Sequence, residues 1–465
     1  MTPATSLALT GRDRDRLHGH LFPGDGLEAA AVMVCTRAPG VRQRLLVRDI
    51  LPVPHEACVA RTRNAITWPG EWIEQAIDIG EPLGATIILI HSHPGGMLGF
   101  SRLDDASDRR VIPSLFEAYG TRHGSAVMTE NGAIVARLYD PGLAVAEVDL
   151  VSVAGDDLEF YWAPERYGAT PRSRPLAFTS DMSAELGRLT AIIVGVSGTG
   201  SIAAEQAARL GFGQVILIDF DRIEKRNLNR ILNSTLRHVD DESLKVEAFA
   251  EAVTLYRGPG VATPVPASLL SRGAILAAAA GDIVFSCVDT LEGRQLCDLM
   301  SSAFLLPLFD VGVVIPVRGQ HDTLTIADVC GRVDYVQPGG STLRDRGVWS
   351  PEALRAEYLR LAAPRAHLDE LAAGYIKGLV EQAPSVITLN MRAAAAMMNE
   401  FIARAYPFRL DPNGLYARTS FSLAACEEDY VAEGEFPCAP NPLLARGNLE
   451  PLLGLPILKT PTVQT

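Results

Sequence analysis

Short apolar runs alternate along the chain with amphipathic stretches of helical period, which is the pattern of a mixed α/β protein. Five apolar runs have the length of strands and are expected to be buried: 29–35, 85–90, 190–194, 215–218 and 283–286. Helices are expected at 102–119, over an Ala-rich stretch that ends near 210, at 351–362 and at 386–406. The turn dipeptide Asn131-Gly132 predicts a β-hairpin.

Between residues 151 and 175 the pattern loses its period, because Gly, Pro, aromatic and charged residues follow one another without order. We therefore predict a linker at 151–175, between an N-terminal domain at 1–150 and a C-terminal domain at 176–465. The tail from about Pro451 is rich in Pro and Leu and is expected to be extended.

Two histidines lie one residue apart at the end of the apolar run 85–90. Alternate side chains of a strand point to the same side, so His91 and His93 can share a ligand. Ser101 is a suitable N-cap for the helix that follows, and it places Asp104 in the first helical turn. Two imidazoles and one carboxylate are a ligand set for a catalytic zinc whose fourth position is left to water.

The order His-x-His-x7-Ser-x2-Asp resembles the signature of the JAMM metalloproteases (the JAB/MPN family), which include deubiquitinating isopeptidases. The resemblance implies an α+β domain in which His91, His93 and Asp104 bind zinc. It also implies that Glu28, directly before the run 29–35, is the general base for water activated by the zinc. Ser101 would then support the oxyanion of the tetrahedral intermediate. A His-x-His pair alone would more often be a surface or core pair than a metal site.

The second motif is a glycine turn between the run 190–194 and an Ala-rich helix. Its glycines, Gly195, Gly198 and Gly200, permit a tight turn and a close approach of phosphate to the helix N-terminus. The next run, 215–218, ends in an acidic Asp-Phe-Asp tip at 219–221. Strand, glycine turn, helix, strand and acidic tip predict the start of a Rossmann-like nucleotide domain. A dinucleotide-binding dehydrogenase would share this pattern.

The residues after the acidic tip resemble the ThiF/MoeB/E1 superfamily, which adenylates the C-terminal glycine of ubiquitin-like proteins. They are an Asn-Leu-x-Arg segment, a later lysine and an aspartate behind the run 283–286. By this resemblance Asp221 would bind the ribose hydroxyls of ATP, while Asn227, Arg230 and Lys245 would bind its phosphates. Asp289 would hold Mg²⁺. Members of this fold are commonly homodimers, and we expect the same here.

Two features of that superfamily are missing. Many relatives carry two Cys-x-x-Cys pairs for a structural zinc, but this chain has Ser341-Thr342-Leu343-Arg344-Asp345 at the first position and only Cys438 near the second. We therefore expect no second zinc. In the plausible regions Cys330 and Cys426 are the only candidates for a thioester cysteine, and a buried free Cys is mostly a small hydrophobe. Adenylation without a thioester, as in the sulfur-carrier branch, is the expectation.

Composition narrows the classes of function. The chain has 42 basic and 55 acidic residues among 465, and its net charge of −13 counts against a non-specific nucleic-acid binder. No apolar run reaches 18 residues, so no membrane span is expected. Seven cysteines without paired spacing favour a reducing compartment over a disulfide framework, and hence a cytoplasmic protein.

Both resemblances together imply a bifunctional enzyme of a bacterial ubiquitin-like or sulfur-carrier pathway. The partner would be a protein whose chain continues beyond a C-terminal Gly-Gly; one site would trim it after the glycine and the other would adenylate that glycine with ATP. Three alternatives stay open. The E1-like half could only recruit the partner, or could adenylate a peptide or small molecule. The third, a dinucleotide oxidoreductase, is disfavoured by the Asn-Leu-x-Arg segment and Asp289.

Overall fold

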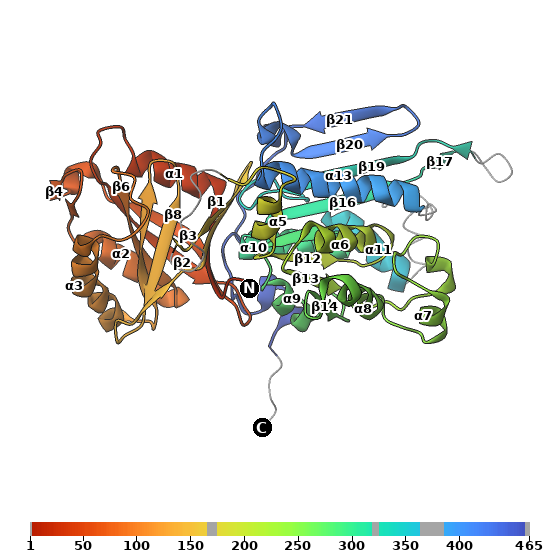
Figure 1. Ribbon diagram of the computed structural model, residues 1–465, viewed down its shortest axis with the longest axis horizontal. Coiled ribbons are helices and arrows are strands. Elements are labelled where there is room, and N and C mark those ends of the chain that lie inside the picture. Colours follow the sequence, from red (N-terminus) through yellow and green to blue (C-terminus); the bar gives the residue numbers. More distant parts are fainter. Residues whose placement is uncertain (1, 165–173, 319–324, 363–385, 461–465) are drawn as a thin grey trace, which may run out of the picture.

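The structure is a computed structural model that describes residues 2–164, 174–318, 325–362 and 386–460. It consists of two α/β halves that lie side by side, each built on one large sheet (Figure 1). The first sheet has the strand order β11-β10-β1-β3-β2-β6-β7-β8-β9, and the second β14-β13-β12-β15-β16-β19-β20-β21. Within the described residues, no helix combines the length and apolarity that crossing a membrane requires.

The elements of the N-terminal half are β1 (Thr5–Thr10), α1 (Gly11–Leu21), β2 (Ala30–Arg37), β3 (Gln43–Pro52), β4 (Ala60–Arg61), β5 (Ile66–Thr67), α2 (Glu71–Gly80), β6 (Thr86–His93), α3 (Arg102–Ala118), β7 (His123–Thr129), β8 (Ile134–Tyr139), β9 (Val145–Glu147), β10 (Leu150–Ala154) and β11 (Leu158–Trp162). The expected strands at 29–35 and 85–90 are β2 and β6, the expected helix is α3, and the expected hairpin joins β7 to β8.

Helices cover both faces of this first sheet. Leu17 and Leu21 of α1 pack on one face, among alternate side chains of β1, β2 and β3. Ile112 and Leu115 of α3 pack on the other face together with α2. Because β2 and β6 lie in the middle of the sheet and are covered on both sides, their sequences are continuously apolar rather than alternating.

The elements of the C-terminal half are α5 (Ser180–Leu186), β12 (Thr190–Val194), α6 (Gly198–Leu210), β13 (Gln214–Ile218), α7 (Leu236–Asp240), α8 (Lys245–Arg257), β14 (Ala262–Val265), α9 (Arg272–Ala278), β15 (Ile283–Ser286), α10 (Leu291–Phe304), β16 (Leu308–Val314), β17 (Val317–Arg318), β18 (Thr325–Ile326), β19 (Cys330–Val336), α11 (Pro351–Ala362), α13 (Ile387–Ala405), β20 (Arg418–Ser422) and β21 (Glu427–Val431). The strands expected at 190–194, 215–218 and 283–286 and the helices expected at 351–362 and 386–406 are all present.

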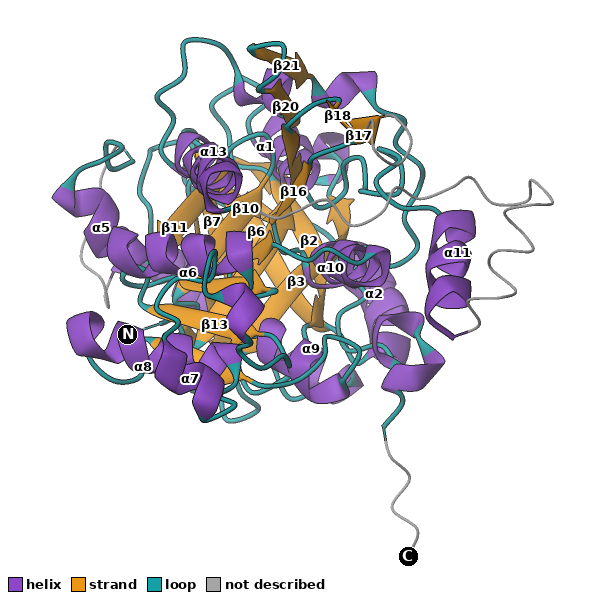
Figure 2. Ribbon diagram, turned by 90° about the vertical axis from the view of Figure 1, so that its right-hand side faces the viewer, coloured by secondary structure: helices purple, strands orange, loops and turns teal. Residues whose placement is uncertain are grey.

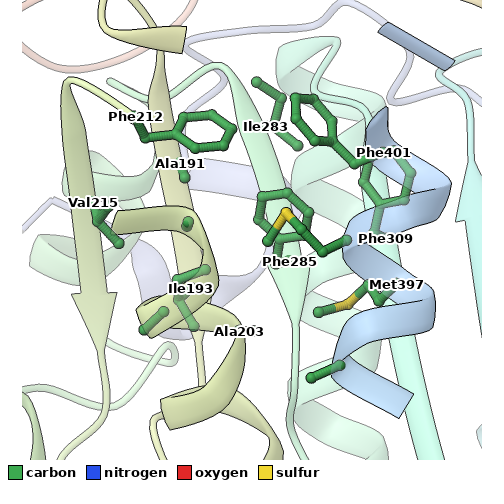
Figure 3. Close-up of a cluster of buried hydrophobic side chains, with 14 of the residues drawn as sticks. Ala191, Ile193, Ala203, Phe212, Val215, Ile283, Phe285, Phe309, Met397 and Phe401 are labelled. Carbon is green, nitrogen blue, oxygen red and sulfur yellow. The ribbon is translucent and has the colours of Figure 1, made fainter. Parts of the chain in front are cut away.

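Strands β14, β13, β12, β15 and β16 are parallel, and β19, β20 and β21 continue the sheet as antiparallel strands. Helices α6 and α13 cover one face and α9 and α10 the other, which gives three layers (Figure 2). Phe285, Phe309 and Phe401 meet in the centre of the first face (Figure 3). Ala393 and Met397 of α13 pack in this same core.

The prediction of a linker at 151–175 is wrong for residues 151–162. Residues 150–154 and 158–162 form β10 and β11, which extend the N-terminal sheet beside β1, and Trp162 is buried. Because β10 pairs with a strand about 145 residues earlier, no local pattern indicates it. The rest of the expected linker, except for residues 163–164 and 174–175, lies outside the described residues.

The expected extended tail is also wrong. Beyond residue 450 the chain forms two 3₁₀ turns, Leu452–Gly454 and Pro456–Leu458. Leu452, Leu453 and Leu458 are buried against the α9 and α10 face of the second sheet. The Leu residues of this Pro/Leu-rich segment thus belong to a core that the sequence pattern alone did not reveal.

A buried ion pair joins the two halves. Arg42 and Arg44 of the N-terminal half approach Asp282 of the C-terminal half, with closest nitrogen–oxygen distances of 2.8 and 3.5 Å. Arg44 also donates hydrogen bonds to the carbonyl oxygens of Phe304 and Leu305, at 3.3 and 3.0 Å. Burial lowers the pKa of its guanidinium to about 10. Apolar residues of β1 and β3 pack into the same core as α9 and α10, so the halves share one buried interface.

This interface predicts a strong loss of stability in Arg44→Met. The substitution keeps most of the side-chain volume but leaves two buried carbonyl oxygens without a donor, so the free energy of unfolding should fall by about 3 kcal/mol. Denaturant unfolding measures this value. The matched control Arg209→Met removes an arginine whose side chain is 62% exposed and should change stability by less than about 0.5 kcal/mol. Equal shifts in the two variants would contradict the role of Arg44.

Candidate metal centre and nucleotide site

Strand β6 and the first turn of α3 bring the three proposed metal ligands together. His91 Nε2 and His93 Nε2 are 3.0 Å apart, and they lie 3.1 and 3.4 Å from the two carboxylate oxygens of Asp104. Two atoms bound to a tetrahedral zinc at about 2.0–2.1 Å from the ion would themselves be about 3.3 Å apart. The spacing of the three side chains therefore fits a tetrahedral zinc with one position left for water.

The protein also orients these ligands. His93 Nδ1 lies 2.9 Å from the carbonyl oxygen of Met97, to which it can donate, and this leaves the lone pair of Nε2 for a metal. Burial alone would raise the pKa of Asp104, but hydrogen bonds from His91 and His93 hold it well below its usual range. Among the described histidines, cysteines and acidic residues, these three are the group whose ligand atoms lie close enough to hold an ion.

Glu28 lies beside this group because β2 pairs with β6, with Ala30 opposite His91. The residue is only 4% exposed, and burial raises the pKa of its carboxyl while His91 and His93 oppose that rise. The backbone of Glu28 is fixed by the β4–β5 segment: its N–H donates to Thr62 at 2.8 Å, and Arg61 donates to its carbonyl oxygen at 2.9 Å. A buried carboxyl near the ligands, and not among them, has the position of a general base.

Ser101 is the N-cap of α3, as the sequence predicts. Its hydroxyl accepts from the Asp104 N–H at 3.2 Å, and its own N–H donates to Asp104 Oδ2 at 2.5 Å. This capping box fixes the Asp104 carboxylate toward the histidines. The hydroxyl hydrogen of Ser101 is not used in these two bonds.

The sequence did not reveal the residues that hold α3 in place. Arg137 of β8 pairs with Asp105 at 2.7 Å and Asp108 at 2.6 Å, and its guanidinium stacks on Phe100 at 3.8 Å. Ser125 also donates to Asp108 at 2.5 Å. Arg137 and Ser125 belong to strands that follow α3 in the chain, and no motif spacing connects them to the histidines.

The glycine turn has the geometry that its sequence predicts. Gly195 has a φ of +83°, which favours glycine. A Cβ on Gly200 would overlap the carbonyl oxygen of Gly195, and a Cβ on Gly198 would crowd the side chains of Asn390 and Arg230. Helix α6 begins at Gly198 with no side-chain cap from Ser197, so its first N–H groups stay available to an anion.

The two aspartates of the acidic tip after β13 have different contacts. Asp219 accepts from the Val196 N–H at 2.7 Å and from the Asp221 N–H at 2.8 Å, and so it ties the glycine turn to the tip. Burial raises the pKa of Asp219. Asp221 is half exposed and pairs with the buried Lys245 at 2.7 Å. The structure therefore brings two of the proposed ATP-binding residues together and adds Asp219 as their support.

The remaining proposed nucleotide residues lie around the start of α6. The side chain of Arg230 passes Gly198, with its Cδ 3.2 Å from where a Cβ would be. Asn227 is buried, and its side chain accepts from the Glu224 N–H at 3.0 Å, a structural role that the sequence did not indicate. Asp289 is exposed and follows β15, whose end packs on Gly195.

The two candidate thioester cysteines lie in the antiparallel part of the second sheet. Cys330 opens β19, and burial raises the pKa of its thiol. Cys426 is exposed in the β20–β21 turn. Cys438 Sγ lies 3.8 Å from the carbonyl oxygen of Gly339. Cys438 and the segment at Gly339 therefore lie close together in this fold.

Comparison with known families matches both halves. Residues 12–138 match the family model described as prokaryotic homologs of the JAB domain. Residues 173–339 match that of the ThiF family. Both matches confirm the resemblances seen in the sequence.

Individual relatives match part of the chain. "Ubiquitin-like modifier-activating enzyme 5" of Culex quinquefasciatus is 31% identical over 161 residues, which cover 32% of this chain and 36% of that protein. The Bombyx mori protein of the same name is 29% identical, with 33% and 38% covered. The chain thus spans little more than a third of the length of these curated relatives.

Solved structures of E. coli MccB are similar at low identity. The complex with succinimide has 15% identity and a TM-score of 0.41 and covers 57% of this chain and 68% of that chain. The microcin C7 biosynthetic enzyme MccB in complex with N-formylated MccA has 17% identity and a TM-score of 0.42, with 54% and 67% covered.

Proposed function

Because this chain joins a JAB domain to a ThiF domain, we propose that it is an enzyme with two sites that act on one ubiquitin-like or sulfur-carrier protein. The first site trims that protein after its C-terminal glycine, and the second adenylates the glycine with ATP. The observation that carries the proposal is the placement of His91, His93 and Asp104 at zinc-binding distances beside the buried Glu28.

The chain's own residues supply the proton transfers of the first reaction. A bound zinc, held by His91, His93 and Asp104, would supply Lewis-acid activation of water and of the scissile carbonyl. Glu28 accepts a proton from the attacking water and returns it to the leaving amine, so that the carboxylate is regenerated. The hydroxyl of Ser101 donates to the oxygen on which negative charge develops.

The second reaction needs charge compensation more than proton transfer. A carboxylate oxygen of the partner's terminal glycine attacks the α-phosphorus of ATP, the bond to the β-phosphate bridging oxygen breaks, and pyrophosphate leaves with that electron pair. The first N–H groups of α6, together with Arg230 and Lys245, stabilise the phosphate charge. Asp221 would hold the ribose and Asp289 would bind the Mg²⁺ that accompanies ATP.

Glu28→Gln separates metal binding from turnover. Glutamine has the shape of the glutamate side chain but cannot take a proton, so zinc content should stay unchanged while the cleavage rate falls by about 10²- to 10⁴-fold. Metal analysis and a cleavage assay on the same preparation measure both quantities. Glu56→Gln, at an exposed position in the neighbouring loop, is the control and should keep both. Loss of zinc in Glu28→Gln would show that Glu28 is a ligand and not the base.

Two assays on the full chain test the proposed function. A candidate ubiquitin-like protein that ends in Gly-Gly is offered with and without a short tail, and tail release is measured before and after removal of zinc. Exchange of labelled pyrophosphate into ATP is measured with the tailless form. We expect zinc-dependent release and partner-dependent exchange. Release without exchange would mean that the ThiF half only recruits the partner. Exchange that depends on a peptide or small molecule would replace the partner class.

A further inference from the structure

Arg294 lies five residues after Asp289, the proposed magnesium ligand, and its side chain is held only by long contacts. Its backbone N–H belongs to the first turn of α10, which follows Asp289 and the N-cap Thr290. Its guanidinium reaches Asp310 only at 3.5 Å and the carbonyl oxygen of Val311 only at 3.4 Å. Its Nε is buried and makes no hydrogen bond of ordinary geometry. An arginine in such a place has unused donor capacity.

A second arginine approaches from the opposite strand. Arg332 of β19 pairs with Gly312 of β16 in register, and its Nη2 donates to Asp310 at 2.8 Å. Its Nη1 contacts Asp334. The Asp310 carboxylate is fully buried and also accepts from Ser286 at 2.7 Å. Arg332 is therefore anchored, whereas Arg294 beside it is held by long contacts alone.

Both guanidinium groups converge on one glycine. A Cβ built on Gly312 would lie 3.2 Å from Arg294 Nη2 and 3.5 Å from the nearest Arg332 nitrogens. A side chain at this position would crowd the two guanidinium groups, so glycine lets both of them lie close to the strand backbone.

This point adjoins the proposed nucleotide site. The carbonyl of Cys287 and the side chain of Val288, at the end of β15, contact the position of a Cβ on Gly195. Asp289 and α10 follow directly, and Ser286 of β15 lies beside Asp310 of β16 in the parallel register. A group in front of Gly312 therefore lies at the carboxyl edge of the strands that also carry the glycine turn and Asp289, where α/β sheets bind ligands.

We propose that Arg294, supported by Arg332, binds the terminal carboxylate of the partner protein and positions it for attack on ATP. This inference rests on the proposed function, and it assigns Arg294 as a residue that binds the attacking group and Arg332 as the residue that supports it. A guanidinium presents two parallel donors that match a carboxylate. An ATP phosphate is also anionic, so the experiment must distinguish the two.

The test uses a Gly-Gly-ended ubiquitin-like protein that supports pyrophosphate exchange, prepared both as the free C-terminal acid and as the C-terminal amide. Binding of each form to the full chain is measured with a non-hydrolysable ATP analogue and Mg²⁺. Wild type should prefer the acid by about tenfold, since a hydrogen bond between charged partners is stronger than one to a neutral amide. Arg294→Gln should lose this preference, Arg294→Lys should retain part of it, and the affinity for the ATP analogue should change little.

Arg318→Gln, at an exposed position on β17, is the control and should keep the preference. If Arg294→Gln keeps the preference for the acid, or if it weakens nucleotide binding instead, the assignment is overturned and Arg294 serves the protein core or the phosphates. If wild type exchanges pyrophosphate with no ubiquitin-like protein, the proposed adenylation itself fails, and this inference fails with it.

Discussion

Asp104→Ala should remove zinc and cleavage together. Asp104 supplies the only carboxylate of the proposed ligand group, and its two oxygens approach both histidines. Without it the site keeps two imidazoles, which is fewer than the three protein ligands of catalytic zinc sites. Zinc content should fall from about one per chain to near zero, and the cleavage rate by about a thousandfold or more. His91→Ala should behave in the same way.

Asp105→Ala is the matched control for this prediction. It removes a carboxylate from the adjacent position of the same helical turn, where Asp105 pairs with Arg137 and is 43% exposed. This variant should keep its zinc and most of its activity. Equal loss of zinc in both variants would mean that the first turn of α3 has been disturbed. Retention of zinc and cleavage in Asp104→Ala would show that the metal ligands are wrongly assigned.

Asp289→Ala should abolish pyrophosphate exchange while cleavage continues. Asp289 follows β15 in the chain and is exposed, so removal of its side chain should not disturb the fold. Loss of the proposed Mg²⁺ ligand leaves the charge that develops on the departing pyrophosphate uncompensated, and exchange should fall by about 10²- to 10³-fold. Arg230→Ala, which removes the cation beside Gly198, should also lower exchange.

Asp241→Ala is the control for the second site, because Asp241 is exposed and its carboxylate pairs with Arg237 four residues earlier. It should leave exchange unchanged. Normal exchange in both Asp289→Ala and Arg230→Ala would show that the nucleotide residues are misplaced. Loss of cleavage as well as exchange would indicate damage to the shared interface of the two halves.

The sequence predicts those parts of the fold that depend on residues close together in the chain. Buried central strands such as β6 and β12 appear as continuous apolar runs, and α3 has its cap and first turn in adjacent residues. Strand β10 was missed because its partner β1 lies at the other end of the N-terminal half. The Arg44 contacts were missed for the same reason, since an arginine in a strand gives no sign of a carboxylate more than 200 residues away.

The same holds for the two sites: residues in motifs were predicted, and contacts between distant segments were not. Motif spacing indicated His91, His93 and Asp104, and the structure brings them within ligand distance of one another. The groups that orient them were not predicted, since the Met97 carbonyl and Arg137 belong to no motif. At the second site the sequence indicated the glycines and the charged residues. It did not indicate Arg294, whose relation to Gly312 exists only after β16 and α10 have packed together.

One measurement tests the central claim, that a single chain trims a protein and then activates it. A ubiquitin-like protein with a tail beyond Gly-Gly is incubated with the full chain, and its intact mass is followed with and without Mg-ATP. We expect loss of the tail in both cases, and an added AMP only with Mg-ATP and only on the shortened protein. An uncut protein, or a shortened one that never gains AMP while Mg-ATP is present, would contradict the account.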